Sequence, residues 1–580
     1  MSNYLEAITN ALAENDYTLG ESLLKEWKSR EDYLFDDTVA ILEGSIFLAQ
    51  GEREKAEKSI YKGLEINAFN SELYFMLGQV KEGAKKYEQA QFSYENAIYY
   101  SNEEDYEALA AYYEDFCNRF QRKEVSIILV TYNQLDMTKL CVDSIRENVP
   151  SGTYEVIIVD NCSTDGTREW LKEQEDIRII LNDDNKGFPV ACNQGAEIAQ
   201  KGNDIFLLNN DTIVLKNSIY NLHMALYERE KTGAVGSCSN NAGKRQRIVE
   251  RFSQPEGYFT YAAKNNAYAP ERHEKRVALV GFAMMVQRDA WEETDGMDEI
   301  YGLGNFEDDD ICLKLLTHGY SLVFCPDSFI FHYGHSSFRG MKQKQSQEYQ
   351  ELLQGNKEIF NRKWGVSWGY FAHVRKELIE YLPYSKNRDF SILDIGCGSG
   401  ATLLQIGNVY PNAQLYGMEL NKEVVDIASH YLNVVQGNIE DRHNPFDRKF
   451  DCIMLGDVLE HLHDAKETLL YLKTWLNKGG FFIISLPNIM HISVIQNLLH
   501  GRFEYQDAGI LDRTHLRFFT LTEIAALMQE CGLTIERISG LSVELTQGQV
   551  DYIEQLSRMD PSIPKDEMNF YQYRIRVGIL

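Results

Sequence analysis

A carboxylate that directly follows a buried strand is the first feature of this sequence that could do chemistry. The apolar run 205–208 favours a strand buried on both faces of a sheet, and it stops at Asn209, Asn210 and Asp211. Open α/β sheets bind ligands at this edge, and Asp211 could hold a hard divalent cation against a diphosphate there. Asn and Asp also favour ordinary turns, so the neighbouring motifs must decide between a metal site and a plain strand exit.

Four consecutive acidic residues at 307–310 form a second such group. A carboxylate within hydrogen-bond reach of a hydroxyl can act as a general base. The same acids also favour the N-terminus of a helix that we expect to begin near Ile311. The two interpretations are compatible, because four adjacent acids cannot all be catalytic.

A glycine-rich segment at 391–400, SILDIGCGSG, is the third group. A predicted strand runs into Asp394, and Gly396, Gly398 and Gly400 let the backbone approach a ligand at a helix N-terminus. Glu419 ends the next predicted strand, where it could bond both hydroxyls of a ribose. By pattern alone a dinucleotide-binding fold competes, because 396–401 also satisfies the GxGxxG/A spacing.

Strands and helices that alternate along the chain would position the first two groups. The segments VSIILVTYN, YEVIIVDNCSTDGT and IRIILNDDNKGFPVACNQGAEIA each start as an apolar strand, and the run at 205–208 follows them. This alternation predicts a parallel, doubly wound α/β sheet whose strand ends share one rim. That rim would collect Asp160, Asp183 or Asp184, and Asp211.

Residues 124–340 resemble a family 2 glycosyltransferase with the nucleotide-binding GT-A fold. The resemblance rests on six motifs in the family's order: VTYN, VDNCSTDGT, NKGFPVACNQG, LLNNDT, GFAMMVQRDAWEETDGMDE and GNFEDDDICLKLLTHGY. It implies that Asp160 contacts the uracil or thymine ring of a UDP- or dTDP-sugar. It also implies that 209–211 stands where the family's metal-binding DxD motif sits. We expect Thr131, Asn133 and Asn210 to share in donor binding.

The same resemblance implies an inverting transfer. The family places the base in a Glu-Asp pair that matches Glu307 and Asp308, and we favour Asp308. A single protein carboxylate can hold Mg²⁺ or Mn²⁺ when phosphates and water supply most ligands, so Asp211 could suffice. His332, at the end of a later strand, is expected to complete the metal shell, with a packed or tautomer-fixed histidine as the alternative.

Residues from about 366 to the end resemble a class I S-adenosylmethionine-dependent methyltransferase, a Rossmann-like α/β domain with a seven-stranded sheet. After the glycine-rich segment, the motifs are GNIED, CIMLGDVLEHL, GGFFIISLPN and GILDRTHLRFFT, and FYQYRIRVGIL looks like the family's last, antiparallel strand. These later motifs favour S-adenosylmethionine over a dinucleotide.

This second resemblance implies roles for residues along the strand ends. Asp394, Gly396, Gly398 and Gly400 would cradle the cofactor and Glu419 would hold its ribose. Asn438 and Ile439 would border the adenine, although the family often has Asp at position 438. Asp457 and His461 would face the methyl-transfer site, with His461 as a possible base or as a packed helix-start residue. His515 and Arg517 are candidates for acceptor contact.

Residues 1–120 are helical in pattern and contain a repeat. Gly44 and Gly78, Ala56 and Ala90, Ile60 and Tyr94, and Gly63 and Ala97 are each 34 residues apart. Small residues at helix crossings with this period resemble tetratricopeptide (TPR) repeats. A generic helical hairpin array is the alternative. The stack could recognise a protein acceptor, or it could cover an apolar face of the transferase or make a dimer contact.

Composition excludes several partners. The net charge of −29 argues against nucleic acid and against an anionic membrane surface. No apolar run approaches the length that spans a bilayer, and the acidic N-terminus is unlike a signal peptide. The ten scattered cysteines have no CxxC pair and no zinc-binding spacing, which favours reduced thiols in the cytoplasm.

The sequence therefore predicts a multidomain enzyme. Its parts would be TPR-like helical repeats at 1–120, a GT-A glycosyltransferase at 121–345, a helical connector at 346–385 and a methyltransferase at 386–580. It would transfer a sugar to a protein acceptor such as flagellin, or to a surface glycan, and methylate the glycan. The alternative is a scaffold in a glycan-modification complex with only one active catalytic domain.

Overall fold

The computed structural model describes residues 2–30, 34–243, 245–334, 347–367 and 372–579. The chain divides into two compact units, residues 1–363 and 364–580. Each unit has its own sheet and its own buried apolar core. Among the described residues, no helix is long and apolar enough to cross a membrane.

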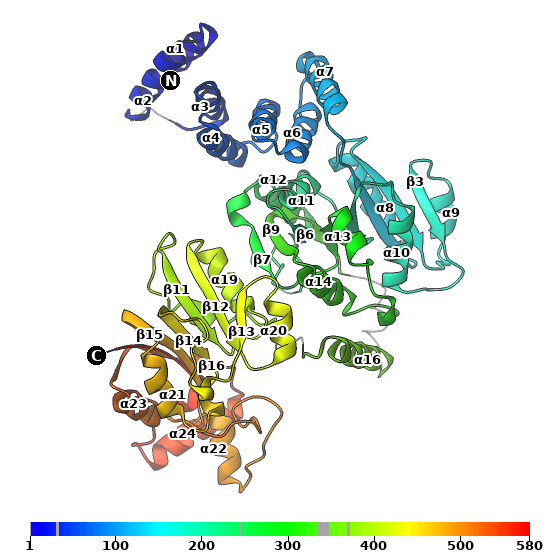
Figure 1. Ribbon diagram of the computed structural model, residues 1–580. Coiled ribbons are helices and arrows are strands. Elements are labelled where there is room, and N and C mark those ends of the chain that lie inside the picture. The colour runs from blue at the N-terminus through cyan, green and yellow to red at the C-terminus, as the bar shows by residue number, and fades with distance from the viewer. Residues whose placement is uncertain (1, 31–33, 244, 335–346, 368–371, 580) are drawn as a thin grey trace. The chain divides into compact units, whose positions relative to one another are not determined.

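The first unit begins with helices that pack in consecutive hairpins (Figure 1). They are α1 (Ser2–Ala13), α2 (Tyr17–Lys28), α3 (Asp37–Ala49), α4 (Arg53–Ile66), α5 (Ser71–Gly83), α6 (Tyr87–Tyr99) and α7 (Glu103–Arg119). The helices α5 and α6 start 34 residues after α3 and α4, as the sequence repeat predicts. A Cβ on Gly78 would lie 2.3 Å from the Tyr94 ring, so glycine is required where these two helices cross. The helical-repeat prediction for this region is confirmed, without a particular repeat family.

The repeats and the following α/β part share one core. Tyr220 and Met224 of α11 (Ser218–Leu226), together with Tyr268, are buried in a single cluster with Phe92 of α6 and Leu77 of α5. Polar contacts line the same surface, since the Gln89 amide donates to the Met224 carbonyl at 2.8 Å. The helical repeats therefore cover an apolar face of the α/β part.

An eight-stranded mixed sheet forms the rest of the first unit, in the order β3-β2-β1-β4-β8-β6-β9-β7. Its strands are β1 (Val125–Thr131), β2 (Tyr154–Asp160), β3 (Ile177–Leu181), β4 (Asp204–Asn209), β6 (Thr232–Cys238), β7 (Glu274–Arg276), β8 (Ala283–Val286) and β9 (Ser321–Phe329). The strands β3, β2, β1 and β4 are parallel, as predicted. The antiparallel strands β8 and β7 make the whole sheet mixed, which the alternation of strands and helices did not anticipate.

Helices, 3-10 turns and a separate two-stranded ribbon complete the first unit. The helices are α8 (Leu135–Asn148), α9 (Thr167–Lys172), α10 (Phe188–Ile198), α12 (Pro255–Asn265), α13 (Arg288–Glu293), α14 (Glu307–Thr317) and α16 (Gln347–Trp364), with 3-10 turns η1 (Pro270–Arg272) and η2 (Glu299–Tyr301). Helix α10 packs on β1 and β2, and α11 packs on β6 and β9. The two-stranded ribbon pairs β5 (Thr212–Ile213) with β10 (Phe331–His332) and places His332 opposite Thr212. This pairing returns the chain to the end of β4.

The second unit has a seven-stranded sheet in the order β13-β12-β11-β14-β15-β17-β16. The strands are β11 (Phe390–Ile395), β12 (Ala413–Glu419), β13 (Asn433–Gln436), β14 (Phe450–Gly456), β15 (Leu476–Pro487), β16 (Leu533–Ser542) and β17 (Phe570–Ile579). The last strand, β17, runs antiparallel to both β15 and β16, which confirms the prediction for FYQYRIRVGIL. The strands β11, β12 and β13 are parallel neighbours, and β14 pairs in parallel with the other edge of β11. The strands β11 and β14 therefore lie side by side in the middle of the sheet.

Helices surround this second sheet (Figure 1). They are α18 (Lys376–Ile379), α19 (Ala401–Val409), α20 (Lys422–Ala428), α21 (Ala465–Lys473), α22 (Ile492–Leu499), α23 (Leu521–Glu530) and α24 (Gln547–Met559), with η3 (Ile439–Asp441), η4 (Leu459–His461) and η5 (Glu567–Asn569). Helix α19 follows the glycine-rich segment directly, and η4 follows β14. Both therefore start at the carboxyl edge of the sheet.

Candidate active sites

A cavity of about 410 Å³ opens at the carboxyl ends of β1 and β4 in the first unit. Its described lining combines strand ends with the loop before α14: Val130, Tyr132, Asn161, Asn185, Phe188, Asn209, Asn210, Asp211, Val280, Gly281, Phe282, Leu303, Gly304, Asn305, Glu307, Asp308 and His332. The sequence brought Asp211 and the acids at 307–308 forward as separate chemical groups. The fold places both groups on one cavity.

Asp211 and His332 face each other in this cavity. The Asp211 side chain is almost fully buried, and its Oδ1 lies 3.1 Å from His332 Nε2. His332 Nδ1 lies 2.8 Å from the Asn241 carbonyl, which can only accept, so Nδ1 carries the proton. The other ring nitrogen, Nε2, faces the Asp211 carboxylate. An imidazole nitrogen and a carboxylate oxygen are donors that suit a divalent metal.

The residues that we predicted to bind the nucleotide-sugar lie in different places around Asp211 and His332. Asn210 lines the cavity, while its amide donates to the hydroxyls of Thr131 and Thr138 at 3.3 and 3.0 Å. Asn133 has φ of 60° and its side-chain oxygen accepts from the Thr164 amide at 2.8 Å. Thr131, Asn133 and Asp160 are outside the described lining, and they support the strand ends beneath it.

Asp160 is fully buried at the end of β2. Its Oδ2 accepts from the Ser163 amide at 3.0 Å and lies 3.6 Å from Arg168 Nε. Asp183 and Asp184, the other candidates for the rim, are exposed, and Asp184 pairs with Lys186 at 2.6 Å. Of the rim acids, Asp211 is the one on the described lining of the cavity.

The acids at the start of α14 have different surroundings. Asp308 lines the cavity, and its carboxylate accepts from the amides of Gly281 at 3.2 Å and Asp309 at 2.9 Å. Asp310 is fully buried and is held by the Tyr301 hydroxyl and by Lys363, whose Nζ lies 2.8 Å from Oδ1. Glu307 also lines the cavity. Asp310 thus faces Tyr301 and Lys363, whereas Asp308 and Glu307 are the acids of this group on the described lining of the cavity.

The loop before α14 is held in an unusual conformation by a residue that the sequence did not indicate. Asn305 and Phe306 both have positive φ, 75° and 74°. The buried amide of Asn356, on α16, lies 2.9, 2.8 and 3.2 Å from the carbonyls of Tyr301, Gly304 and Asn305. Strained backbone at a cavity persists when its surroundings hold it. Asn356 therefore positions the loop that carries Leu303, Gly304 and Asn305.

The glycine-rich segment of the second unit wraps the end of β11. Gly396, Gly398 and Gly400 have φ of 71°, 54° and 75°, which glycine tolerates best. Glu419, at the end of β12, accepts from the Gly398 amide at 2.9 Å through one oxygen. Its other oxygen accepts from the Leu420 and Asn421 amides. Burial raises the pKa of Asp394 to about 8, partly offset by Arg375.

The remaining predicted residues of this unit surround the same edge. Asn438 caps η3 by accepting from the Glu440 amide at 3.0 Å, and the neighbouring Ile439 is buried. Asp457 follows β14 with φ of 57°, and its carboxylate is bound by Arg375 Nη1 at 2.8 Å and by Ser485. His461 is half-buried, and burial lowers its pKa. The structure thus gathers these residues at one edge, and their roles remain predictions.

Comparison with known proteins assigns both units. The family described as glycosyl transferase family 2 matches residues 126–293, and the family described as methyltransferase domain matches residues 368–538. The chain contains a family 2 glycosyltransferase domain and a methyltransferase domain.

Individual relatives are similar to one domain each. A malonyl-[acyl-carrier protein] O-methyltransferase of Halalkalibacterium halodurans is 28% identical over 189 residues, 30% of this chain and 64% of the relative. A glycosyltransferase assigned to teichuronic acid biosynthesis in Bacillus subtilis is 37% identical over 91 residues, 15% of this chain and 35% of the relative. A solved structure of GalNAc-T7 with UDP, GalNAc and Mn²⁺ has a TM-score of 0.31 and 16% identity, covering 37% of this chain and 44% of that one. This chain spans less than two thirds of each relative's length.

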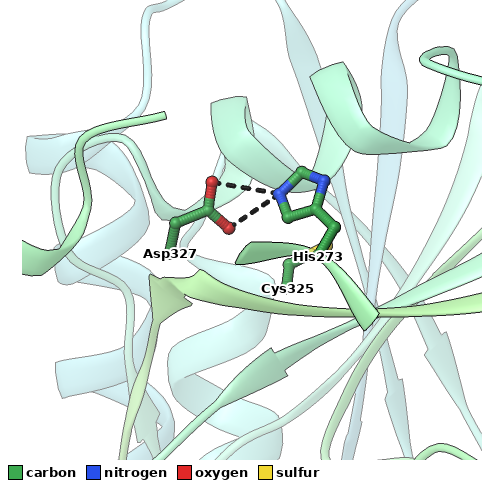
Figure 2. A group of neighbouring side chains, drawn as sticks. All are labelled: His273, Cys325 and Asp327. Atoms are coloured by element: carbon green, nitrogen blue, oxygen red, sulfur yellow. Dashed lines mark hydrogen bonds and ion pairs between the residues drawn. The ribbon is translucent and has the colours of Figure 1, made fainter. Parts of the chain in front are cut away.

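A buried ionic cluster lies elsewhere in the glycosyltransferase domain. His273 Nε2 lies 2.9 Å from Asp327 Oδ1 (Figure 2). Its Nδ1 lies 3.4 Å from Glu228 Oε2. Burial lowers the pKa of His273, but the two carboxylates outweigh it and raise the pKa to about 9. The ring is therefore an imidazolium, and each of its two nitrogens makes an ion pair. Although Cys325 lies beside it, the cluster is a closed salt bridge and a poor metal site.

Several lining residues of the glycosyltransferase cavity were missed by sequence reasoning. Phe282 stacks on the His332 ring at 5.2 Å between centroids, and the Asn161 amide donates to the Gly187 carbonyl at 3.1 Å. Both residues fall inside motifs that carry the family resemblance. The motifs could identify the segments, whereas the choice of side chains within them needed the fold.

Proposed function

We propose that this protein is a bifunctional enzyme that transfers a sugar from a nucleotide-sugar donor with inversion and methylates the glycan with S-adenosylmethionine. The observation that carries the first half is the shared cavity of Asp211, His332 and Asp308. It combines a candidate anchor for a metal-bound diphosphate with a carboxylate that could take a proton from the acceptor.

The geometry supports a division of labour in the glycosyltransferase cavity. Asp211 and His332 would hold Mg²⁺ or Mn²⁺, which would neutralise the donor's diphosphate. Asp308 would accept the proton of the acceptor hydroxyl on the face opposite the leaving nucleotide. The amides of Gly281 and Asp309 keep that carboxylate in place. Asp160 and Asn210 would contribute to a UDP- or dTDP-sugar site.

The methyltransferase half rests on the glycine-rich segment and Glu419. The three glycines have positive φ and would leave room for the methionine end of S-adenosylmethionine. The Glu419 carboxylate, which accepts from the Gly398 amide, would bond the hydroxyls of a ribose. Asp394, Asn438, Ile439 and Asp457 would complete the cofactor site. Methyl transfer from a sulfonium needs alignment above all, so these residues would act by binding and orientation.

Separate observations support the acceptor class and the compartment that we propose. One relative is named for teichuronic acid biosynthesis, and a helical-repeat surface suits an extended protein such as flagellin. We propose a glycan or glycoprotein acceptor, with the protein acceptor as the first choice. All ten cysteines are free thiols, which supports a reducing cytoplasmic compartment. The alternative is a scaffold in a glycan-modification complex with only one active domain.

A ligand screen on the full chain tests both halves. We expect a UDP- or dTDP-sugar to raise the melting temperature only with Mg²⁺ or Mn²⁺ present, and S-adenosylmethionine to raise it without metal. Asp211→Ala should remove the first effect and Gly398→Val the second, because a side chain at Gly398 would fill cofactor space. Each variant serves as the control for the other domain. The absence of any nucleotide-sugar effect, with S-adenosylmethionine still bound, would favour the scaffold.

A further inference from the structure

A second group of potential metal ligands lies in the methyltransferase domain. Glu460 and His461 belong to η4, and His515 comes from the loop before α23. One ligand atom from each of the three residues lies within 4.8 Å of the others. His515 is 54 residues after His461 in the chain, so the fold brings the three side chains together.

This group borders the predicted cofactor site. Residues 457–461 follow β14, which pairs with β11 at the centre of the sheet. Val458 contacts the glycine-rich segment, since a Cβ on Gly396 would lie 3.1 Å from its Cγ2. The group is therefore next to the place where a methyl group would be transferred.

Glu460 is a buried carboxylate that lacks the usual compensation. It is 1% exposed, and among the described residues neither of its oxygens accepts a hydrogen bond. The nearest ring nitrogen, His515 Nε2, lies 4.0 Å from Oε1. Burial raises the pKa of Glu460 well above its usual range. A buried carboxyl is costly unless it is paired or coordinates a metal, so this side chain indicates a missing partner.

Both histidines present acceptor nitrogens. His515 Nδ1 lies 2.9 Å from the Ile510 carbonyl, and His461 Nδ1 lies 3.3 Å from the Thr514 carbonyl. Carbonyls only accept, so each Nδ1 carries a proton, and in the neutral tautomer that this contact favours the lone pair is on Nε2. A carbonyl bonded to the distal nitrogen is the usual way that proteins orient metal-binding histidines.

Other acids of the chain already have hydrogen-bond or ion-pair partners. Asp457 is bound by Arg375 and Ser485 and also accepts from Gln572. In the other domain, Asp327 and His273 form a closed ion pair (Figure 2). Those carboxylates have partners already, whereas Glu460 is aimed at two imidazoles.

We propose that Glu460, His461 and His515 bind a divalent cation of the Mn²⁺ or Zn²⁺ class beside the cofactor. Two imidazoles and one carboxylate suit such a cation and leave positions open for other ligands. The inference extends the proposed methyltransferase function, because an open position would hold the acceptor hydroxyl.

The cation would lower the pKa of a bound hydroxyl, so that its proton passes to water. The hydroxyl oxygen then forms a bond to the methyl carbon while the carbon–sulfur bond of S-adenosylmethionine breaks. S-adenosylhomocysteine and the methyl ether are the products. His461 would act as a ligand, and the base assigned to it from the sequence would be unnecessary.

Titration of the full chain with Co²⁺ tests the site through its visible ligand-field absorption. The Asp211→Ala background removes the other proposed metal site. We expect one equivalent of Co²⁺, and binding weaker by about tenfold or more in both His461→Ala and Glu460→Gln. His463→Ala is the matched control, because that exposed histidine pairs with Glu440 outside the group. S-adenosylmethionine binding reports whether each variant is folded.

Unchanged Co²⁺ binding in folded His461→Ala and Glu460→Gln would overturn the proposal, as would the absence of binding in the background variant. If Asp211→Ala is insoluble, the otherwise wild-type chain must lose one equivalent of Co²⁺ on His461→Ala. Failure of S-adenosylmethionine to bind the wild-type chain would overturn the methyltransferase function instead. The two failures are therefore distinguishable.

Discussion

At the scale of single residues, surroundings separate side chains that look equivalent in the sequence. Asp308 and Asp310 are two residues apart on α14, but Asp310 is neutralised by Lys363 and Asp308 faces the cavity. Glu419 and Glu460 both follow strands of the second sheet. Backbone amides satisfy Glu419, whereas Glu460 lacks hydrogen bonds from the described residues. Chemical availability is thus a property of the site rather than of the residue type.

Asp308→Asn should leave donor binding intact and reduce sugar transfer by about 10²–10⁴-fold, because the amide cannot take the acceptor's proton. The measurement is initial rate of transfer together with donor affinity. Asp183→Asn, on an exposed loop outside the described lining, is the control and should behave as wild type. Full activity in Asp308→Asn would move the base to Glu307.

At the scale of elements, α16 and the loop before α14 act as one piece. Asn356 spans three carbonyls of the loop, and Lys363 bridges Asp298 and Asp310. The ring of Phe360 also contacts Phe306 at 5.7 Å between centroids. A helix that follows the sheet in sequence therefore shapes the side of the cavity that carries Leu303, Gly304 and Asn305.

Asn356→Ala should destabilise the loop by about 1–3 kcal/mol, because buried carbonyls lose their donor. Since the loop lines the cavity, we expect the rate of sugar transfer to fall while S-adenosylmethionine binding is unchanged. Gln354→Ala on the same helix is the control, because this side chain is exposed and its amide donates to Glu358. Equal transfer rates for the two variants would contradict a positioning role for Asn356.

The ionic cluster of His273 predicts a pH dependence. The pKa of His273 is about 9 in the folded chain and about 6.5 when unfolded, so its stabilisation is complete below pH 6.5 and is lost as the pH rises to 9. Thermal melts should show the largest difference between wild type and His273→Gln near pH 6 and the smallest above pH 9. The exposed His318→Gln should show no such trend. A constant difference across this range would contradict a charged His273.

At the scale of the whole molecule, the chain is two compact units, and the first contains both the repeats and the glycosyltransferase domain. The repeats bury Tyr220, Met224 and Tyr268 of that domain. Their role in covering an apolar face is therefore built into the fold. Any recognition of an acceptor by the repeats would come in addition to this structural role.

Deletion of residues 1–120 should expose those three side chains and give aggregated protein with little nucleotide-sugar hydrolysis. Size-exclusion chromatography followed by the hydrolysis assay is the measurement. The comparison is a shorter deletion of residues 1–30, which removes α1 and α2 and leaves that shared core in place. A monodisperse, active product of the longer deletion would show that the repeats are dispensable for folding.

The sequence by itself determined the kind of elements, their order and the two families. Local patterns are enough for this, because apolar runs, glycine spacing and a 34-residue period are properties of neighbouring residues. It also brought forward Asp211, Asp308 and Glu419. The alternation of strands and helices puts Asp211 and Glu419 at strand ends, and the run of acids puts Asp308 near the start of a helix.

Only the tertiary structure decided which side chains meet. The Asp211–His332 pair depends on the β5–β10 ribbon, and the loop before α14 depends on Asn356 from a later helix. Glu460, His461 and His515 become neighbours when the loop before α23 reaches η4. Contacts of this kind join residues far apart in the chain, so a sequence period cannot reveal them. Burial, which makes Glu460 a candidate ligand, is likewise set by everything that packs around it.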